Sequence, residues 1–117
     1  MIEFEIPGLP KMPNELLGSH WRIRSSNASK WFGLVMVAVN PFKRTKISSP
    51  ARLTLIRYSA VEPDHDGLVG SFKAVIDGLV KCGVIPDDSP DHIKAEYLWE
   101  KCPPKKGKIK VRIEEPK

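Results

Sequence analysis

The sequence predicts an α+β domain in which a mixed sheet of about four strands carries two helices. Four segments alternate apolar and polar residues with period two, and two segments show helical spacing of apolar residues. These segments follow one another in the order β-α-β-α-β-β. A chain of 117 residues that is 41% hydrophobic and 28% charged suits one core, so we expect a single domain over residues 1–117.

The first half of the chain contains two predicted strands and the first helix. Apolar residues alternate with acids from Ile2 to Ile6, which predicts a half-buried strand, and the proline-rich segment 7–13 is typical of a loop. Polar residues offer helix N-caps at Ser25, Ser26, Asn27 and Ser29. Asn40-Pro41 should end that helix, and alternation over 52–59 predicts the second strand.

The second half contains the other predicted helix and two further strands. After Asp66-Gly67, one helical stripe is formed by Leu68, Phe72, Val75, Ile76 and Leu79. Gly83 stands just past this stripe and is the expected C-cap. Residues 93–100 and 108–113 alternate again, with a turn over 103–107 between them.

Charge is distributed unevenly along the chain, whose formal net charge is +5. Residues 16–61 contain eight basic residues and no acid, and residues 62–100 contain nine acids and three lysines. Basic residues dominate again after position 100. Basic surface attracts phosphates, whereas clustered carboxylates hold a cation. The pattern fits a metal-dependent enzyme acting on a polyanion or, alternatively, charged faces that only contact solvent.

The sequence lacks the features of membrane, secreted and zinc-ribbon proteins. Its longest apolar run, Trp31 to Val39, is far shorter than the roughly 18 residues of a membrane span. Acids stand near the amino terminus, where a signal peptide would carry lysines. Cys82 and Cys102 form no Cys-x-x-Cys pair, so we expect two free thiols. Together with the amino terminus, these thiols predict a cytoplasmic protein, and the short apolar run predicts no membrane partner.

Two acidic motifs form the candidate site. Asp64 and Asp66 follow the second predicted strand two residues apart, so in extended backbone their carboxylates point the same way. Asp87 and Asp88 occupy the turn after the second helix, and we expect this turn to return close to the strand end that the chain left. Carboxylate oxygens suit Mg²⁺ or Mn²⁺ rather than Zn²⁺. The alternative is structural, with Asp66 as a helix cap and Asp87-Asp88-Ser89-Pro90 as an ordinary turn.

Lys73 is the candidate cation of this site. It follows Asp66 by seven residues, two helical turns, and can therefore share a face with Asp66, Gly70 and Asp77. In the functional interpretation, its ammonium touches the scissile phosphate or neutralises charge that develops there. In the structural interpretation, it only pairs with Asp77 four residues later.

Taken together, these motifs resemble the RusA family of Holliday junction resolvases. The resemblance is carried by Leu9-Pro10 and Asn14, by Asp64-His65-Asp66-Gly67, by Lys73 through Asp77 and Leu79, and by Gly83-Val84-Ile85-Pro86-Asp87-Asp88. These separated elements agree in order over nearly the whole chain. Two departures stand out: Gly67 replaces the asparagine of the family pattern, and the interval from Asp66 to Lys73 is longer than in some members.

The resemblance implies a homodimeric endodeoxyribonuclease of DNA recombination and repair that cuts paired strands of a four-way junction. Asp64, Asp66 and Asp88 would be catalytic carboxylates that bind Mg²⁺, or Mn²⁺ in its place, with Lys73 assisting. Asp87 would either bind the metal or support Asp88. Two alternatives stay open: a non-catalytic nucleic-acid-binding module, and a nuclease of the same fold that acts on other branched DNA.

Basic residues of two segments are the predicted DNA contacts. The first segment follows Asn14, which is itself a predicted contact, and contains Arg22, Arg24 and Lys30. We expect it to lie beside the strand ends that carry Asp64 and Asp66. Further cations on the last turn would extend this surface: Lys105, Lys106 and Lys108. Each phosphate contact releases counterions, so the logarithm of affinity should fall with that of salt by roughly 0.9 per contact.

Overall fold

The computed structural model describes residues 1–16, 21–42, 45 and 47–116. Its strands are β1 (Ile2–Pro7), β2 (Ala51–Ser59), β3 (Ile93–Lys101) and β4 (Lys108–Glu114). They form one sheet in the order β1-β4-β2-β3. β2 runs parallel to β3, and the other neighbouring pairs are antiparallel, so the sheet is mixed, as predicted.

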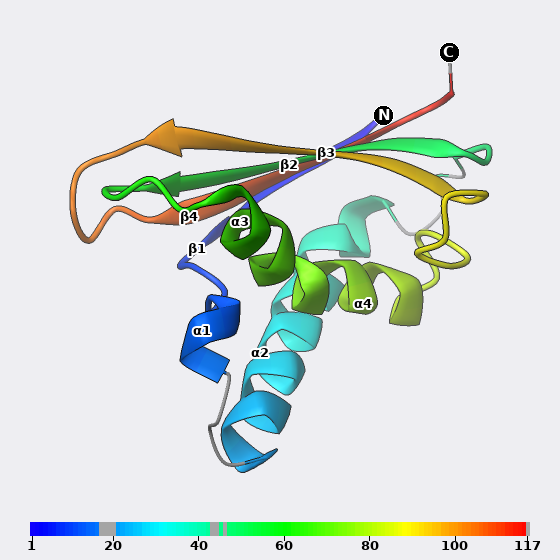
Figure 1. The fold of residues 1–117 in the computed structure, drawn as a ribbon. Coiled ribbons are helices and arrows are strands. Elements are labelled where there is room, and N and C mark those ends of the chain that lie inside the picture. Colours follow the sequence, from blue (N-terminus) through cyan, green and yellow to red (C-terminus); the bar gives the residue numbers. More distant parts are fainter. Residues whose placement is uncertain (17–20, 43–44, 46, 117) are drawn as a thin grey trace.

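The helices cover one face of this sheet and leave the other face open (Figure 1). They are α1 (Pro13–Leu16), α2 (Trp21–Val39), α3 (His65–Ser71) and α4 (Lys73–Lys81), with a 3₁₀ turn η1 (Asn40–Phe42) after α2. The beginning of α2 projects away from the sheet together with α1 (Figure 1). The predicted α+β class and its β-α-β-α-β-β order are confirmed, with the one-turn helix α1 added before α2.

The hydrophobic core lies between the sheet and the helices α2 to α4. β4 lies between β1 and β2, and its inward side chains Ile109, Val111 and Ile113 are wholly buried. The helices contribute further buried side chains to the same core: Trp31, Val35, Leu68, Phe72, Val75 and Leu79. Each fully buried large apolar side chain contributes about 1.5–3 kcal/mol, so this layer is the main source of stability.

The start of α2 differs from the sequence prediction. The N-cap assignment of Ser25, Ser26, Asn27 and Ser29 is wrong, because all four lie inside a helix that begins at Trp21. Polar residues inside a helix cost only a few tenths of a kcal/mol each, and the buried residues of α2 outweigh that cost. The predicted end at Asn40-Pro41 is confirmed. In the described part of the chain, no helix has the length and hydropathy needed to cross a membrane.

The second predicted helix is present as two helices that meet at Phe72. This residue is both the C-cap of α3 and the N-cap of α4, and its side chain is wholly buried. Its ring centroid lies 6.1 Å from that of Tyr97 in β3. α4 ends where predicted, because Gly83 adopts a φ of 79° that favours glycine. The amides of Gly83 and Val84 donate to carbonyls of the last turn in a Schellman arrangement.

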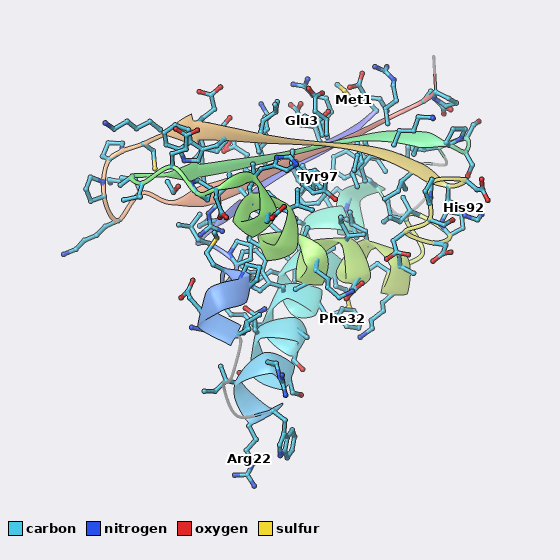
Figure 2. The ribbon with its side chains drawn as sticks, viewed as in Figure 1. Met1, Glu3, Arg22, Phe32, His92 and Tyr97 are labelled. Atoms are coloured by element: carbon cyan, nitrogen blue, oxygen red, sulfur yellow. The ribbon has the colours of Figure 1, made fainter. Side chains whose placement is uncertain are left out.

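Ion pairs between β1 and β4 occupy the open face of the sheet. The Nε of Arg112 donates to Oε2 of Glu3 at 2.6 Å, and the Nζ of Lys108 lies 2.6 Å from Oε2 of Glu5. Figure 2 shows Glu3 on this open side and Tyr97 toward the helices. The hydrogen bond from Arg112 holds the pKa of Glu3 below its ordinary value.

Candidate active site and nucleic-acid interface

Asp64 and Asp66 lie at the start of α3, just beyond the end of β2. Asp64 is the N-cap: its backbone is extended (φ −68°, ψ 164°), and its Oδ1 accepts a hydrogen bond from the Gly67 amide at 3.2 Å. Asp66 lies in the first turn of α3, so the expected extended backbone across both aspartates is wrong, because the helix already begins at His65; both side chains are exposed. The helix cap is therefore Asp64 rather than Asp66, and it uses one of the two carboxylate oxygens.

Gly67 is explained by the position of the Asp64 carboxylate. A Cβ atom on Gly67 would lie 2.5 Å from Oδ1 of Asp64 and 2.5 Å from Cε of Met12. Real Cβ atoms do not approach other atoms so closely, so any side chain at position 67 would displace both groups. The departure from the family pattern at this position thus allows the carboxylate to sit against the helix start.

Asp87 and Asp88 lie in the turn that precedes β3, whereas Asp64 and Asp66 follow β2 along the chain. β2 and β3 are parallel, so Ile93 lies opposite Ala51, and the turn before Ile93 lies near the start of β2. The expectation that this turn returns to the end of β2 is wrong, because a parallel crossover must return to the starting edge. Oδ1 of Asp87 accepts the Asp88 amide at 2.8 Å, which lowers the pKa of Asp87 and ties its carboxylate to the turn.

Asp88 nevertheless reaches a cavity beneath the helices. It lines a space of about 250 Å³ together with Lys73, Asp77 and Tyr97, which we call the α4–β3 cavity. The Nζ of Lys73 lies 3.9 Å from Oδ2 of Asp77, so the predicted pair four residues apart is confirmed. Burial raises the pKa of Tyr97, and the negative charge of Asp88 raises it further.

A hollow of about 450 Å³ lies beside this cavity and is lined by residues of all four α-helices in the described part of the chain. Its charged lining residues are Lys11, Arg24, Lys73 and Asp77, and we call it the basic groove. Lys73 and Asp77 line both spaces, so the groove and the α4–β3 cavity adjoin. Asn14 stands in α1, but its side chain lies outside the described part of the chain.

The basic groove adjoins a further hollow of about 570 Å³ along α2. Lys11 lines both, and Arg22 and Lys30 line only the second. The Arg22 guanidinium lies 5.6 Å from the centroid of the Trp21 ring, at the tip of α2 and away from the sheet (Figure 2). Arg22, Arg24 and Lys30 therefore belong to one helix and not to a loop beside the end of β2.

Lys105 and Lys106 lie at the same end of the sheet as the first acidic motif. The loop between β3 and β4 exposes both side chains. Lys105 lines a pocket of about 720 Å³ together with Glu62 and Pro63, and we call it the strand-end pocket. Pro63 directly precedes Asp64, so Lys105 adds positive charge near the start of α3.

The predicted aspartates offer the oxygen ligands that Mg²⁺ prefers, but too few of them lie together to form a complete ligand set. Among the described residues, no three His, Cys, Asp or Glu side chains lie close enough together to hold a metal ion. The predicted set of four aspartates is therefore not assembled within one chain. Mg²⁺ often binds only one or two carboxylates and completes its shell with water and substrate phosphate oxygens. Asp64 and Asp66 fit that mode, because they stand together at the start of α3.

Sequence reasoning overlooked three residues that shape these spaces: Lys11, Arg57 and Tyr97. Lys11 stands alone in a proline-rich loop, and no periodicity marks it. Tyr97 belongs to the alternating segment 93–100, a pattern that predicts a strand but no cavity. Arg57 carries a usable signal, because it occupies an inward position of β2 after Leu53 and Leu55. A charge at such a position indicates a buried and therefore specialised group.

The chain was compared with protein-family models and with curated proteins. No family model matches it, and no curated protein matches it. The resemblance to junction resolvases therefore rests on the sequence motifs alone.

Proposed function

We propose that this chain is a Mg²⁺-dependent endodeoxyribonuclease that resolves four-way DNA junctions. The position of Lys73 carries the proposal. Lys73 lines the basic groove with Lys11 and Arg24, and it lines the α4–β3 cavity with Asp88. A surface that attracts phosphates thus adjoins carboxylates, as hydrolysis of a polyanion requires.

The basic groove would bind the backbone of one DNA arm. Lys11 and Arg24 offer donors to phosphates inside the groove, and Arg22 and Lys30 extend the positive surface along α2. Such contacts fix the position of the protein on DNA but do not read its sequence. Selection of the branched substrate would follow from the arrangement of the arms.

The residues at the start of α3 would hold the ion. Asp64 and Asp66 supply hard oxygen ligands, and phosphate oxygens of the substrate and water would complete the shell. Bound Mg²⁺ supplies Lewis-acid stabilisation and a more acidic water. Lys73 would neutralise charge on the phosphate, with Asp77 positioning its ammonium from 3.9 Å. Asp88 would offer a carboxylate acceptor for a water proton in the same cavity.

The junction substrate and a homodimer enter the proposal from the resemblance to the RusA family. A four-way junction has near two-fold symmetry, so a C2 dimer would present the same site to two opposed strands. We expect sedimentation to show a dimer on junction DNA. A monomer at concentrations that support cleavage, both free and on DNA, would contradict this part.

The cysteines support a cytoplasmic location. In the described part of the chain, Cys82 and Cys102 are both unpaired thiols. Burial raises the pKa of Cys82, so this thiol stays protonated and unreactive at neutral pH. Unpaired thiols of this kind are typical of reducing compartments, and we place the enzyme in the cytoplasm.

One cleavage assay tests the proposal. We expect the protein to cut four-way junctions with Mg²⁺ or Mn²⁺, not to cut them without a divalent ion, and to leave linear duplexes intact. Asp66→Asn and Asp88→Asn should abolish cutting while junction binding is kept or tightened, because a charge that repels phosphate is removed. Asp91→Asn is the matched control, since Asp91 is exposed near Asp88 but does not line the cavity. Unchanged rates in both test variants would reject the assignment.

The same assay separates the alternatives. Tight junction binding without cleavage in either metal would identify a non-catalytic nucleic-acid-binding module. Faster cutting of three-way or flap substrates would identify a nuclease for other branched DNA.

A further inference from the structure

The strand-end pocket adjoins the proposed active site and is distinct from it. It forms beyond the end of β2, where the segments 7–12 and 103–107 pass one another. Pro63 lines it, and Asp64 is the next residue along the chain. Its volume of about 720 Å³ lies within the range of small-molecule sites, about 300–1,000 Å³.

A buried guanidinium lines this pocket. Only 6% of Arg57 is exposed, and this burial lowers its pKa. Its Nη1 donates to the carbonyl of Pro10 at 2.9 Å. None of the ion pairs in the described part of the chain involves Arg57. The charge of Glu15 raises the pKa of Arg57 from beyond ion-pair distance. Buried cations are normally paired with an anion, so the charge of Arg57 is incompletely compensated by the protein.

The remaining donors of Arg57 have no acceptor in the described part of the chain. Within the described residues, no buried side-chain nitrogen lacks a hydrogen-bond partner. The Nε and Nη2 of Arg57 have no protein acceptor there, so they belong to the small accessible part of the side chain. Because that side chain lines the pocket, these two donors are available to an oxyanion inside it.

The pocket combines this cation with an apolar wall. Lys105 contributes a second positive group, so two cations stand against the one carboxylate of Glu62, and the wall consists mainly of Leu9, Met12, Val61, Pro63 and Pro103. Val61 is 79% exposed, which leaves an apolar edge without a partner within the described chain. A ligand with a phosphate at one end and a flat, weakly polar ring at the other matches both parts.

We infer that the strand-end pocket binds one unstacked nucleotide of branched DNA, with its phosphate on Arg57 and Lys105 and its base against the apolar wall. The nature of the DNA rests on the proposed function. Taking a base out of the stack costs least where it is already unpaired, as at a branch point. A nucleotide held here would bring its neighbouring phosphodiester to the start of α3, next to Asp64.

The first test uses free ligands and the full chain. The four 2′-deoxynucleoside 5′-monophosphates, inorganic phosphate and the free nucleosides are titrated while backbone and arginine side-chain NMR signals are followed. We expect the nucleotides to shift the signals of Gly8, Arg57, Val61 and Lys105, and to bind more tightly than phosphate or nucleoside alone.

Matched variants test the contacts. Val61→Asp should weaken nucleotide binding at least about tenfold, because it places an anion and a polar group at the apolar edge. Val37→Asp is its control, since Val37 is 73% exposed on α2 and does not line the pocket. Lys105→Gln should weaken binding roughly threefold, as expected for an exposed charge. Lys101→Gln should leave it unchanged, because Lys101 is exposed at the end of β3 but does not line the pocket.

Two results would overturn the inference. One is inorganic phosphate binding as tightly as the nucleotides, and the other is unchanged nucleotide affinity in both Val61→Asp and Lys105→Gln. A junction with 2-aminopurine beside the branch extends the test to DNA: its fluorescence should rise on binding wild-type protein and rise less with Val61→Asp. Nucleotide binding without junction cleavage would keep the nucleotide site and reject the proposed function, whereas cleavage without nucleotide binding would do the reverse.

Discussion

The backbone amide of Gly67 donates to Oδ1 of Asp64 at 3.2 Å, and no side chain fits at position 67 while this contact is kept. One oxygen of the candidate metal ligand therefore caps α3, and the other is left for chemistry. The Asp64 carboxylate both caps α3 and belongs to the candidate site. Substitutions at or beside Asp64 can therefore change activity and the free energy of unfolding to different degrees.

Gly67→Ala should reduce activity with little effect on stability. The new Cβ meets only the ends of two flexible side chains, so we expect the free energy of unfolding to change by less than about 1 kcal/mol. The Asp64 carboxylate must move, and a misplaced catalytic group costs up to about a hundredfold in rate. Gly33→Ala is the control, because nothing lies near its Cβ position. Full junction cleavage by Gly67→Ala would show that the carboxylate position is unimportant.

Asp64→Asn and Asp64→Ala should differ in stability but not in activity. Asparagine caps a helix about as well as aspartate, whereas alanine costs about 1 kcal/mol of stability. Both variants lose the ligand charge, so neither should cut junctions. Urea denaturation and cleavage assays measure the two effects. Wild-type cleavage by Asp64→Asn would reduce Asp64 to a helix cap.

Gly70→Ala should destabilise the fold, unlike Gly67→Ala. A Cβ on Gly70 would collide with Cγ of Pro13, which belongs to a rigid ring at the start of α1. α1 must then move away from α3, at a cost of about 1–3 kcal/mol. Gly70 and Pro13 both line the basic groove, so DNA affinity should fall as well. Wild-type stability of Gly70→Ala would show that α1 packs loosely.

The double variant Arg22→Ala with Arg24→Ala should weaken binding to DNA of any shape. If both arginines contact phosphate, the slope of log affinity against log salt should flatten by about two units at most. Preference for branched over linear DNA should survive, because phosphate contacts only position the protein. Binding isotherms at several salt concentrations measure the slope. A full wild-type slope in the double variant would mean that the start of α2 only faces solvent.

Glu3→Gln should change how stability depends on pH. The hydrogen bond from Arg112 lowers the pKa of Glu3 in the folded chain. A carboxylate of this kind stabilises the fold above its unfolded pKa of about 4.3, and the stabilisation is lost as the pH falls through the folded pKa. Urea midpoints of wild type and Glu3→Gln should therefore differ most near neutral pH and converge in acid. Glu100→Gln, exposed on β3, is the control, and a difference that grows in acid would contradict the assignment.

Local chemistry determined the type of most elements and several of their ends. Alternation predicts β2 and β4 because one face of each strand is buried, and the ends of α2 and α4 follow from Asn40-Pro41 and Gly83. The pair of Lys73 and Asp77 follows from helical spacing alone. Local sequence signals do not predict the start of α2 or the break at Phe72, because burial in the core outweighs helix propensity at both places.

The arrangement of the site was decided only by tertiary structure. Spacing placed Asp64 and Asp66 close together in the chain, but the start of α3 sets their backbone, and the parallel pairing of β2 with β3 places the turn of Asp87 and Asp88 near the start of β2 and not its end. The packing of α1, α2 and α4 brings Lys11 and Lys73, which lie far apart in sequence, to the same groove. Side-chain periodicity reports which face of an element is buried, whereas the order of strands and the meeting of helices depend on contacts between residues far apart in sequence.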